Sequence, residues 1–281
     1  MNDCVFEQAV AKAQPNAKWP LTETWIRHTR SAYNALKDKR RQTDLYQEFS
    51  GHFCEWIPRL GEPAPTRLRE LAIMVQREFA LNTGDHNTLV DESAVQQAYE
   101  MAANLSMESE LPDIICVSPY FRTQETLRYM EEGWPALKSV PRVFEERIRE
   151  QDHGLAIVYN DWKVFTVFFP EQQVLHDLQG PYWYKYPQGE NVPDVRIRNW
   201  LYGDKRIRDF AGKHVMNISH HLNILAERAN REGWDAEQFI ECDTVDKPIN
   251  CGVTRYKFDP EAGQNGQGKL VLDYYNKCLY A

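Results

Sequence analysis

The sequence has no hydrophobic run that approaches the roughly 18 apolar residues of a membrane-spanning helix. Its first residues, Met1-Asn2-Asp3-Cys4, do not form a basic region followed by an apolar one, so they do not predict a secretory signal. Together, these two absences predict a cytoplasmic protein that has no membrane partner.

Closely spaced cysteine pairs are also missing. The cysteines stand at positions 4, 54, 116, 242, 251 and 278. Because no two of them form a C-x-x-C pair, the spacing supports neither a zinc site nor a disulfide framework, and it predicts reduced thiols. We therefore expect no metal and no other cofactor.

An excess of basic residues is lacking as well. The chain has 33 Lys and Arg against 41 Asp and Glu, a formal net charge of −8. A broad surface for nucleic acid is not expected at this charge. The local run Lys37-Asp38-Lys39-Arg40-Arg41 is interpreted as a solvated face, with contact to an anion or to nucleic acid as the alternative.

The length and composition predict a sizeable core, since the chain has 281 residues of which 42% are apolar. Residues 1–67 are predicted to form an N-terminal helical extension, because apolar residues around Trp25 and Phe49 recur at helical spacing. A linker rich in proline and glycine closes this extension. Residues 68–281 are then predicted to form the main domain.

The main domain alternates between predicted strands and helices. An unbroken apolar run at residues 71–75 predicts the first strand, since a strand covered on both faces shows no alternation. Further strands are predicted at 114–117, around 143–144 and at 215–219, and a hairpin is predicted at 252–258 and 269–275. Helices are predicted at 91–105 and 222–231, and a third begins at Pro119 with Ser118 as its cap. Residues 155–212 are predicted to form a helical and irregular insertion. This pattern predicts an α/β fold, a three-layer α/β/α sandwich.

Polar residues follow several of the predicted strands. Gln76 to Asn82 follow the first strand, Ser118 to Arg122 the second, and His220 ends the fourth. Open α/β sheets place ligands at the carboxyl ends of their strands, and arginine, histidine and a helix N-terminus together suit a phosphate group. Glu150, after the third strand, could serve as a general acid and a histidine as a nucleophile.

These segments resemble the motifs of the histidine phosphatase (phosphoglycerate mutase-like) superfamily over residues 68–280. The family's Ser-Pro-x-x-Arg-x-x-x-Thr is intact at 118–126, and Ile148-Arg149-Glu150 with Gly154 is similar to its acid-bearing segment. Ser219-His220-His221 resembles the family's Ser-His-Gly, and residues 187–190 and 250–254 are similar to two further segments. The resemblance implies a phosphoglycerate mutase-like fold.

The first family motif, Arg-His-Gly-Glu-Ser/Thr-x-x-Asn, is degenerate when it is placed at the end of the strand predicted at 71–75. That register puts Gln76 at the position of the histidine that is phosphorylated in the family. A glutamine amide can donate a hydrogen bond to phosphate, but it has no nucleophilic nitrogen. The resemblance therefore implies no assured catalytic residue. It gives Gln76, Glu150 and His220 as family-equivalent positions, and Arg122, His220, Gln76, Arg77 and Asn82 as phosphate-binding residues.

These residues predict a catalytically inactive histidine-phosphatase-like protein that retains a partial phosphate-binding cleft. Its partner would be a phosphate-containing small molecule or a protein, with a homo-oligomer as a further alternative. The alternative function is an active phosphomonoesterase or phosphoglycerate mutase-type enzyme with a rearranged site, and a third is a scaffold that assembles through the N-terminal helices. His220 stays open between phosphate ligand, nucleophile and structural histidine, and Arg122 between anion ligand and ion-pair partner of Glu150.

Overall fold

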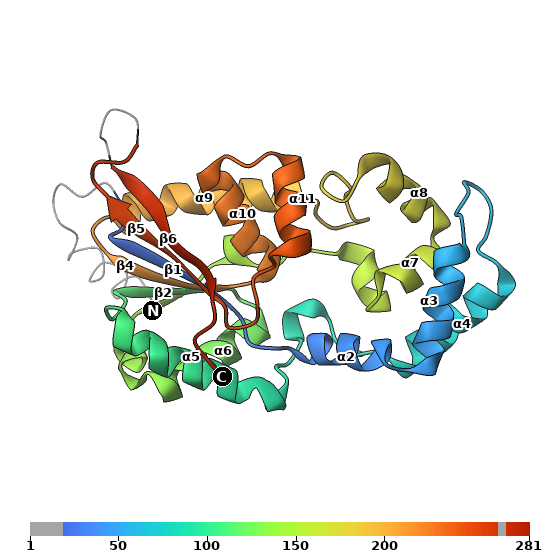
Figure 1. The fold of residues 1–281 in the computed structure, drawn as a ribbon, viewed down its shortest axis with the longest axis horizontal. Coiled ribbons are helices and arrows are strands. Elements are labelled where there is room, and N and C mark those ends of the chain that lie inside the picture. The colour runs from blue at the N-terminus through green and yellow to red at the C-terminus, as the bar shows by residue number, and fades with distance from the viewer. Residues whose placement is uncertain (1–18, 264–267) are drawn as a thin grey trace. The chain divides into compact units, whose positions relative to one another are not determined.

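Six strands form one sheet in the computed structural model, which describes residues 19–263 and 268–281 (Figure 1). Their order is β3-β2-β4-β1-β5-β6. Strands β3, β2, β4 and β1 are parallel, whereas β5 pairs antiparallel with both β1 and β6. The strands are β1 (Thr22–Arg27), β2 (Ile114–Val117), β3 (Arg142–Phe144), β4 (His214–Ser219), β5 (Val253–Asp259) and β6 (Lys269–Lys277). The carboxyl ends of β1, β2 and β4 therefore meet at one edge of the sheet.

Contacts divide the chain into two compact units. Among the described residues, the first holds 19–30, Val90–Glu150, 195–263 and 268–281, and the second holds Ser31–Leu89 and Gln151–Asp194. The sheet and the helices that cover it belong to the first unit. No helix within the described residues is both long and apolar enough to cross a membrane.

Helices cover both faces of the sheet in the first unit, because successive strand residues point to opposite sides. Ile26 packs with Met101 and Met130 on one face, whereas Trp25 packs with Tyr202 and with apolar residues of the other face. Figure 1 shows α5 and α6 on one side of the sheet and α9, α10 and α11 on the other. These helices are α5 (Val95–Glu108), α6 (Phe121–Gly133), α9 (Val192–Asp209), α10 (His221–Glu232) and α11 (Ala236–Val245).

The second unit is helical and has its own core, in which Phe49 and Leu71 are fully buried. A buried ion pair joins Arg40 to Asp161 at 2.6 Å, and the Tyr46 hydroxyl donates to the same carboxylate at 2.7 Å. The basic run that contains Arg40 is therefore not wholly a solvated face. The helices of this unit are α2 (Ala32–Arg41), α3 (Asp44–Glu55), α4 (Thr66–Glu78), α7 (Trp162–Phe168) and α8 (Pro170–Gln179).

Short 3-10 helices complete the two units: η1 (Asp85–Asn87), η2 (Glu92–Ala94), η3 (Pro135–Ser139), η4 (Glu146–Ile148) and η5 (Gly154–Tyr159).

The predicted α/β/α sandwich is confirmed, as are the strands at 114–117, 143–144 and 215–219 and the terminal hairpin. The predicted helices at 91–105 and 222–231 correspond to η2 with α5 and to α10. The serine cap is wrong, because α6 begins at Phe121 and its N-cap is Tyr120. The Ser118 hydroxyl contacts a histidine side chain instead.

The strand predicted at residues 71–75 is wrong, because this run lies inside helix α4. Its buried residues are Leu68, Leu71, Ala72 and Val75, which recur at the three- and four-residue spacing of one helix face. Ile73 and its neighbour Met74 are instead exposed. The five apolar letters in a row thus combine a buried stripe with two residues on the outer face.

The predicted N-terminal extension is helical only in part. It contains β1, which lies between β4 and β5 near the middle of the sheet, as well as α2 and α3. Trp25, whose spacing suggested a helix, lies on β1. Part of the extension, residues 1–18, lies outside the described residues.

Candidate functional site

Polar residues gather at the carboxyl ends of the three parallel strands β1, β2 and β4. Arg27 ends β1 and His28 follows it, Ser118 follows β2, and His220 follows β4. The alternating strand geometry and the shared strand direction bring these residues to one edge of the sheet. The imidazole rings of His28 and His220 lie 5.1 Å apart between centroids.

His28 is held as a neutral imidazole whose one ring lone pair accepts from an arginine. Its Nδ1 lies 2.7 Å from the carbonyl oxygen of Thr29. Because a carbonyl oxygen only accepts, Nδ1 carries the proton and Nε2 has the lone pair. The Arg122 side chain donates from Nε to this Nε2 at 3.2 Å.

The pKa of His28 lies well below 6.5, first because the ring is buried and next because the charges of Arg122 and Arg27 oppose its protonation. The side chain is only 3% exposed. A histidine in this state is uncharged near neutral pH, and its Nε2 lone pair is directed at a guanidinium. Such a nitrogen can attack an electrophile that the guanidinium binds.

His220 is the second buried histidine of the site. Its Nε2 lies 2.7 Å from the Ser118 hydroxyl, and the Tyr120 ring packs against it at 5.0 Å. Burial, followed by the charge of Arg122, holds its pKa well below 6.5. Its Nδ1 is buried and has no hydrogen-bond partner among the described residues. If the Ser118 hydroxyl donates to Nε2, this Nδ1 becomes a donor for an anion beside His28.

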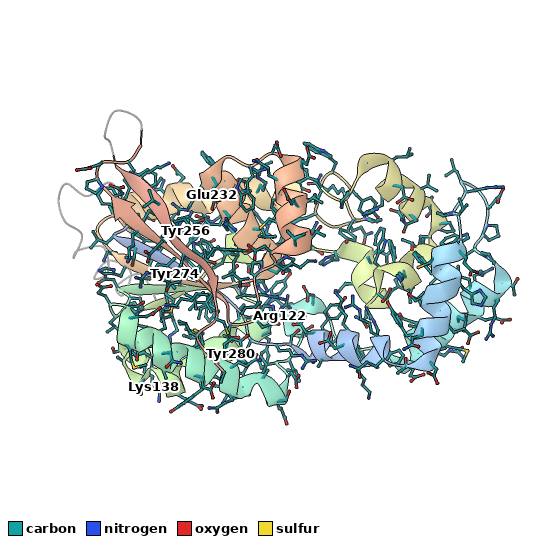
Figure 2. The ribbon with its side chains drawn as sticks, viewed as in Figure 1. Arg122, Lys138, Glu232, Tyr256, Tyr274 and Tyr280 are labelled. Carbon is teal, nitrogen blue, oxygen red and sulfur yellow. The ribbon has the colours of Figure 1, made fainter. Side chains whose placement is uncertain are left out.

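Two arginines supply positive charge to the same edge. Arg122, labelled in Figure 2, is 4% exposed and lies against the Tyr120 ring at 4.9 Å. Arg27 donates to the carbonyl of Pro248 at 2.6 Å. Burial lowers the pKa of Arg27, Glu150 raises it, and the charge of Arg122 lowers it further. Two guanidiniums and an imidazole donor make a site that suits a phosphate group.

Glu150 lies at the N-terminus of α10, where the backbone N–H of Leu222 donates to its carboxylate at 3.2 Å. Its position is fixed from the other side, because Arg198 donates to its backbone carbonyl at 2.9 Å. The carboxylate is also within the electrostatic reach of Arg27. A carboxyl group so placed can give a proton to a leaving group and later take one from water.

The structure separates the predicted site residues into two groups. Arg122, His220 and Glu150 belong to the sheet-containing unit with His28. Gln76, Arg77 and Asn82 belong to the second unit: the Gln76 amide donates to the carbonyl of Val158 at 2.9 Å, Arg77 lies in the last turn of α4, and Asn82 has a φ of 53°. The register that placed Gln76 at the nucleophile position is therefore wrong, because α4 is not the first strand.

The sequence prediction missed Arg27 and His28. The signal that identifies them is Arg27-His28-Thr29-Arg30-Ser31-Ala32-Tyr33-Asn34, which follows β1 and matches the family's first motif at its arginine, histidine, hydroxyl and asparagine positions. Ser31 and Asn34 form the capping box at the start of α2. Thr29 replaces the family's glycine, and Arg30 replaces its glutamate.

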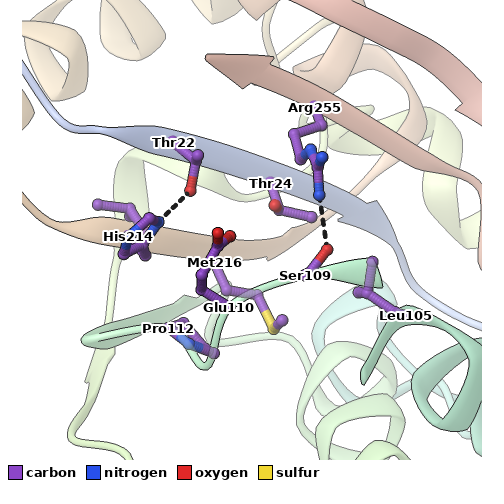
Figure 3. A pocket seen from close by; sticks show the side chains of 10 residues that line it. Thr22, Thr24, Leu105, Ser109, Glu110, Pro112, His214, Met216 and Arg255 are labelled. Carbon is purple, nitrogen blue, oxygen red and sulfur yellow. Dashed lines mark hydrogen bonds between the residues drawn. The ribbon is translucent and has the colours of Figure 1, made fainter. Parts of the chain in front are cut away.

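A small pocket lies at the opposite edge of the sheet, where β1 and β4 begin (Figure 3). Thr22 and His214 line it with a 2.9 Å hydrogen bond, and Arg255 donates to the Ser109 hydroxyl at 2.7 Å. Its volume is about 10 Å³, which is room for about one water molecule. It is too small for a substrate.

A metal site is not evident in the part of the chain that the structure describes, where no three His, Cys, Asp or Glu side chains are grouped so that they could hold an ion.

Comparisons with known proteins identify the family of the chain. The sequence model of the histidine phosphatase superfamily (branch 1) matches residues 78–265. The phosphoglycerate mutase-like protein AT74 of Arabidopsis thaliana is 30% identical over 215 residues, which are 70% of this chain and 63% of that protein. The chain thus spans less than two thirds of this curated relative.

Two solved structures share the fold. A putative alpha-ribazole-5'-P phosphatase from Escherichia coli superposes with a TM-score of 0.62 at 13% identity, covering 93% of this chain and 98% of that one. A mycobacterial glucosyl-3-phosphoglycerate phosphatase in complex with inorganic phosphate gives a TM-score of 0.59 at 14% identity, covering 92% and 98%. At these identities the likeness concerns the fold alone.

Proposed function

The chain belongs to the histidine phosphatase superfamily (branch 1), and we propose that it is an active phosphomonoesterase in which His28 accepts the phosphoryl group. The observation that carries the proposal is the state of His28. Its Nδ1 is held by the Thr29 carbonyl at 2.7 Å, and its Nε2 faces the Arg122 guanidinium at 3.2 Å. A lone pair next to a guanidinium is the arrangement that an attack on a bound phosphate requires.

The expectation of an inactive protein depended on Gln76 at the nucleophile position. Gln76 lies in helix α4, and a histidine follows the first strand of the sheet instead. The proposal therefore takes up the alternative of an active phosphomonoesterase, with a different nucleophile and without a rearranged site. The substrate class is a phosphate-containing small molecule.

In the first step, Arg27, Arg122 and the Nδ1 of His220 bind the oxygens of the phosphate group. The Arg122 Nε–H turns from His28 to a phosphate oxygen, and the lone pair of His28 Nε2 then attacks phosphorus. An N–P bond forms as the ester P–O bond breaks. Glu150, in its protonated form, gives its proton to the departing oxygen, and an alcohol leaves. The guanidiniums stabilise the negative charge on the transferring group.

In the second step, water attacks phosphorus and the N–P bond breaks. Glu150, now a carboxylate, takes a proton from this water, and inorganic phosphate leaves with His28 restored as a neutral imidazole. The depressed pKa of His28 supports this cycle, because a protonated imidazole would have no lone pair for the attack.

Hydrolysis of p-nitrophenyl phosphate by the full chain tests the proposal. We expect turnover by the wild type, and a loss of at least about a thousandfold in kcat for His28→Ala, since removal of a nucleophile takes away the whole covalent route. Gln76→Ala is the matched control and should keep wild-type kcat. If His28→Ala stays active, or if Gln76→Ala is the variant that loses activity, the assignment is wrong.

A binding-only protein would give a different result. It would bind inorganic phosphate in calorimetry, lose that binding in Arg122→Met, and hydrolyse no phosphate ester. That outcome would refute the phosphomonoesterase and would favour the ligand-binding function.

A further inference from the structure

Thr29 follows the proposed nucleophile directly, at a position where the similar family motif has glycine. The residue is fully buried, at 0% exposure. A glycine at this place would offer only its backbone groups to the surroundings. The threonine adds a methyl group and a hydroxyl, and the hydroxyl has a defined partner.

Hydrogen bonds hold Thr29 to different parts of the sheet-containing unit, among them one between its side chain and that of Cys251. Its hydroxyl donates to the carbonyl of Ala94 at 2.7 Å, and its backbone N–H donates to the Thr126 hydroxyl at 3.0 Å. Its carbonyl accepts from Nδ1 of His28 at 2.7 Å. Ala94 ends η2, and Thr126 lies in α6.

The helix α6 and the segment before α5, which hold Thr29, make further hydrogen bonds close to it. The Thr126 hydroxyl donates to the backbone carbonyl of Arg122 at 2.6 Å, so the N–H of Thr29 is joined to the helix turn that carries the phosphate-binding guanidinium. On the other side, the N–H of Asp91 donates to the carbonyl of Arg30 at 2.8 Å. The residues at 29 and 30 are therefore fixed both by α6 and by the segment that precedes α5.

The carbonyl of Thr29 holds the proton of His28 on Nδ1, and with the Arg122 Nε that donates to Nε2 it makes Nε2 the nucleophile. The direction of that carbonyl depends on the backbone torsions of Thr29. The hydrogen bond from its hydroxyl to the Ala94 carbonyl restrains these torsions, whereas a glycine has no side chain that could restrain them.

We propose that Thr29 is a positioning residue whose hydroxyl, bonded to the Ala94 carbonyl, fixes the backbone carbonyl that orients His28 and sets its tautomer. This inference rests on the proposed function for its effect on turnover. Its effect on the tautomer of His28 is independent of turnover.

The test compares three substitutions at this position in the full chain. Thr29→Val keeps the branched shape and removes the hydroxyl, Thr29→Ser keeps the hydroxyl, and Thr29→Ala removes it with less crowding. Thr254→Val is the control: Thr254 is a threonine of β5 that is 1% exposed, and its hydroxyl accepts from the N–H of Asn276 at 3.2 Å. It removes a buried hydroxyl from the same sheet away from the His28 loop.

The first measurement is nitrogen NMR of the imidazoles, with the His28 signals assigned by their absence in His28→Gln. The wild type and Thr29→Ser should show a protonated Nδ1 and an unprotonated Nε2. Thr29→Val and Thr29→Ala should show a mixture of tautomers. A purely structural role would lower the stability and leave the tautomer unchanged, as we expect for Thr254→Val.

The second measurement is the kinetics of p-nitrophenyl phosphate hydrolysis. Because a displacement of about 1 Å can reduce a rate by about a hundredfold, we expect kcat to fall roughly tenfold to a hundredfold in Thr29→Val and Thr29→Ala. KM should change by less than about threefold, since the phosphate-binding arginines remain. Thr29→Ser should restore most of the wild-type kcat.

The outcomes separate the two proposals. If the wild type hydrolyses nothing but the valine variant changes the tautomer, the phosphomonoesterase fails and the positioning role stands. If valine and alanine both leave the tautomer and kcat unchanged, the positioning role is overturned. If Thr29→Val fails to fold, Thr29→Ala decides by the same two measurements.

Discussion

Replacing Arg122 with methionine should move the acid limb of the pH–rate profile to higher pH. The Arg122 charge is the largest cause after burial that lowers the pKa of His28. Without this charge the pKa of His28 rises towards 6.5. The neutral, nucleophilic form of His28 is then lost at a higher pH as the solution is acidified, so kcat/KM starts to fall earlier.

The size of the shift follows from the distance between the two groups. Arg122 Nε and His28 Nε2 are 3.2 Å apart, and the charge is spread over the guanidinium beyond Nε. Two unit charges about 4 Å apart interact by roughly 4 kcal/mol at an effective dielectric constant of about 20, which corresponds to about 3 pKa units. We therefore expect an upward shift of at least about 1 unit.

The assay is kcat/KM for p-nitrophenyl phosphate between pH 4 and 8, which reports the ionisation of the free enzyme. Arg128→Met is the control, because Arg128 is an exposed arginine of the same helix that pairs with Glu125. The substrate is the same in each case, so its own ionisation cancels in the comparison. An NMR titration of His28 gives the same pKa if turnover is too slow. A limb that does not move, or that moves to lower pH, would refute the reasoning.

Three further predictions concern stability. His28 and His220 have pKa values well below 6.5 in the folded chain, so in acid the unfolded chain binds more protons than the folded one. The melting temperature should therefore be constant above about pH 6.5 and fall below it. A series of thermal unfolding curves from pH 8 to 5 measures this. In α4, Val75→Asp should destabilise the fold by more than about 3 kcal/mol in urea unfolding, whereas Met74→Asp should stay within about 0.5 kcal/mol, because Val75 is 1% and Met74 49% exposed. Arg206→Met removes an ion-pair partner from the buried carboxylates of Glu23 and Glu227 and should lower the free energy of unfolding by about 3–5 kcal/mol, whereas the exposed Arg208→Met should change it by almost nothing. If the two variants of either pair lost equal stability, the burial on which these predictions depend would be contradicted.

Most elements of the sheet-containing unit could be predicted from local sequence. Strand β2 is four apolar residues that are all buried, and β4 has five buried residues in a row. In such runs the buried residues are consecutive and do not recur at the three- and four-residue spacing of a helix, and each run is followed by a helix. The pattern of strands and helices therefore predicted the layers correctly even though one strand was misplaced.

Strand β1 could not be found in this way because only two of its six residues, Trp25 and Ile26, are apolar. Glu23 is 1% exposed on this strand and would be costly to bury alone. It is paired with Arg206 of α9 at 2.8 Å and with Arg231 of α10 at 2.6 Å. These partners lie far along the chain, so local patterns give no sign that a carboxylate can be buried here.

Three of the predicted site residues lie together in the sheet-containing unit, and their roles stay predictions. Arg122, Glu150 and His220 were identified from short segments that follow true strands or turns of the sheet-containing unit. His28 was missed because the first strand was placed at 71–75, where the apolar run belongs to a helix. This error in secondary structure placed Gln76, and not His28, after the first strand, and the prediction of an inactive protein depended on it.

The most direct test of the account is to find the phosphorylated residue. The full chain is mixed briefly with p-nitrophenyl phosphate, denatured in alkali to preserve a phosphorus–nitrogen bond, and digested for mass spectrometry. We predict a phosphate on His28 in the wild type and in Gln76→Ala, and none in His28→Ala. A phosphate on another residue, or hydrolysis that proceeds with no phosphohistidine in rapid-quench samples, would contradict the account.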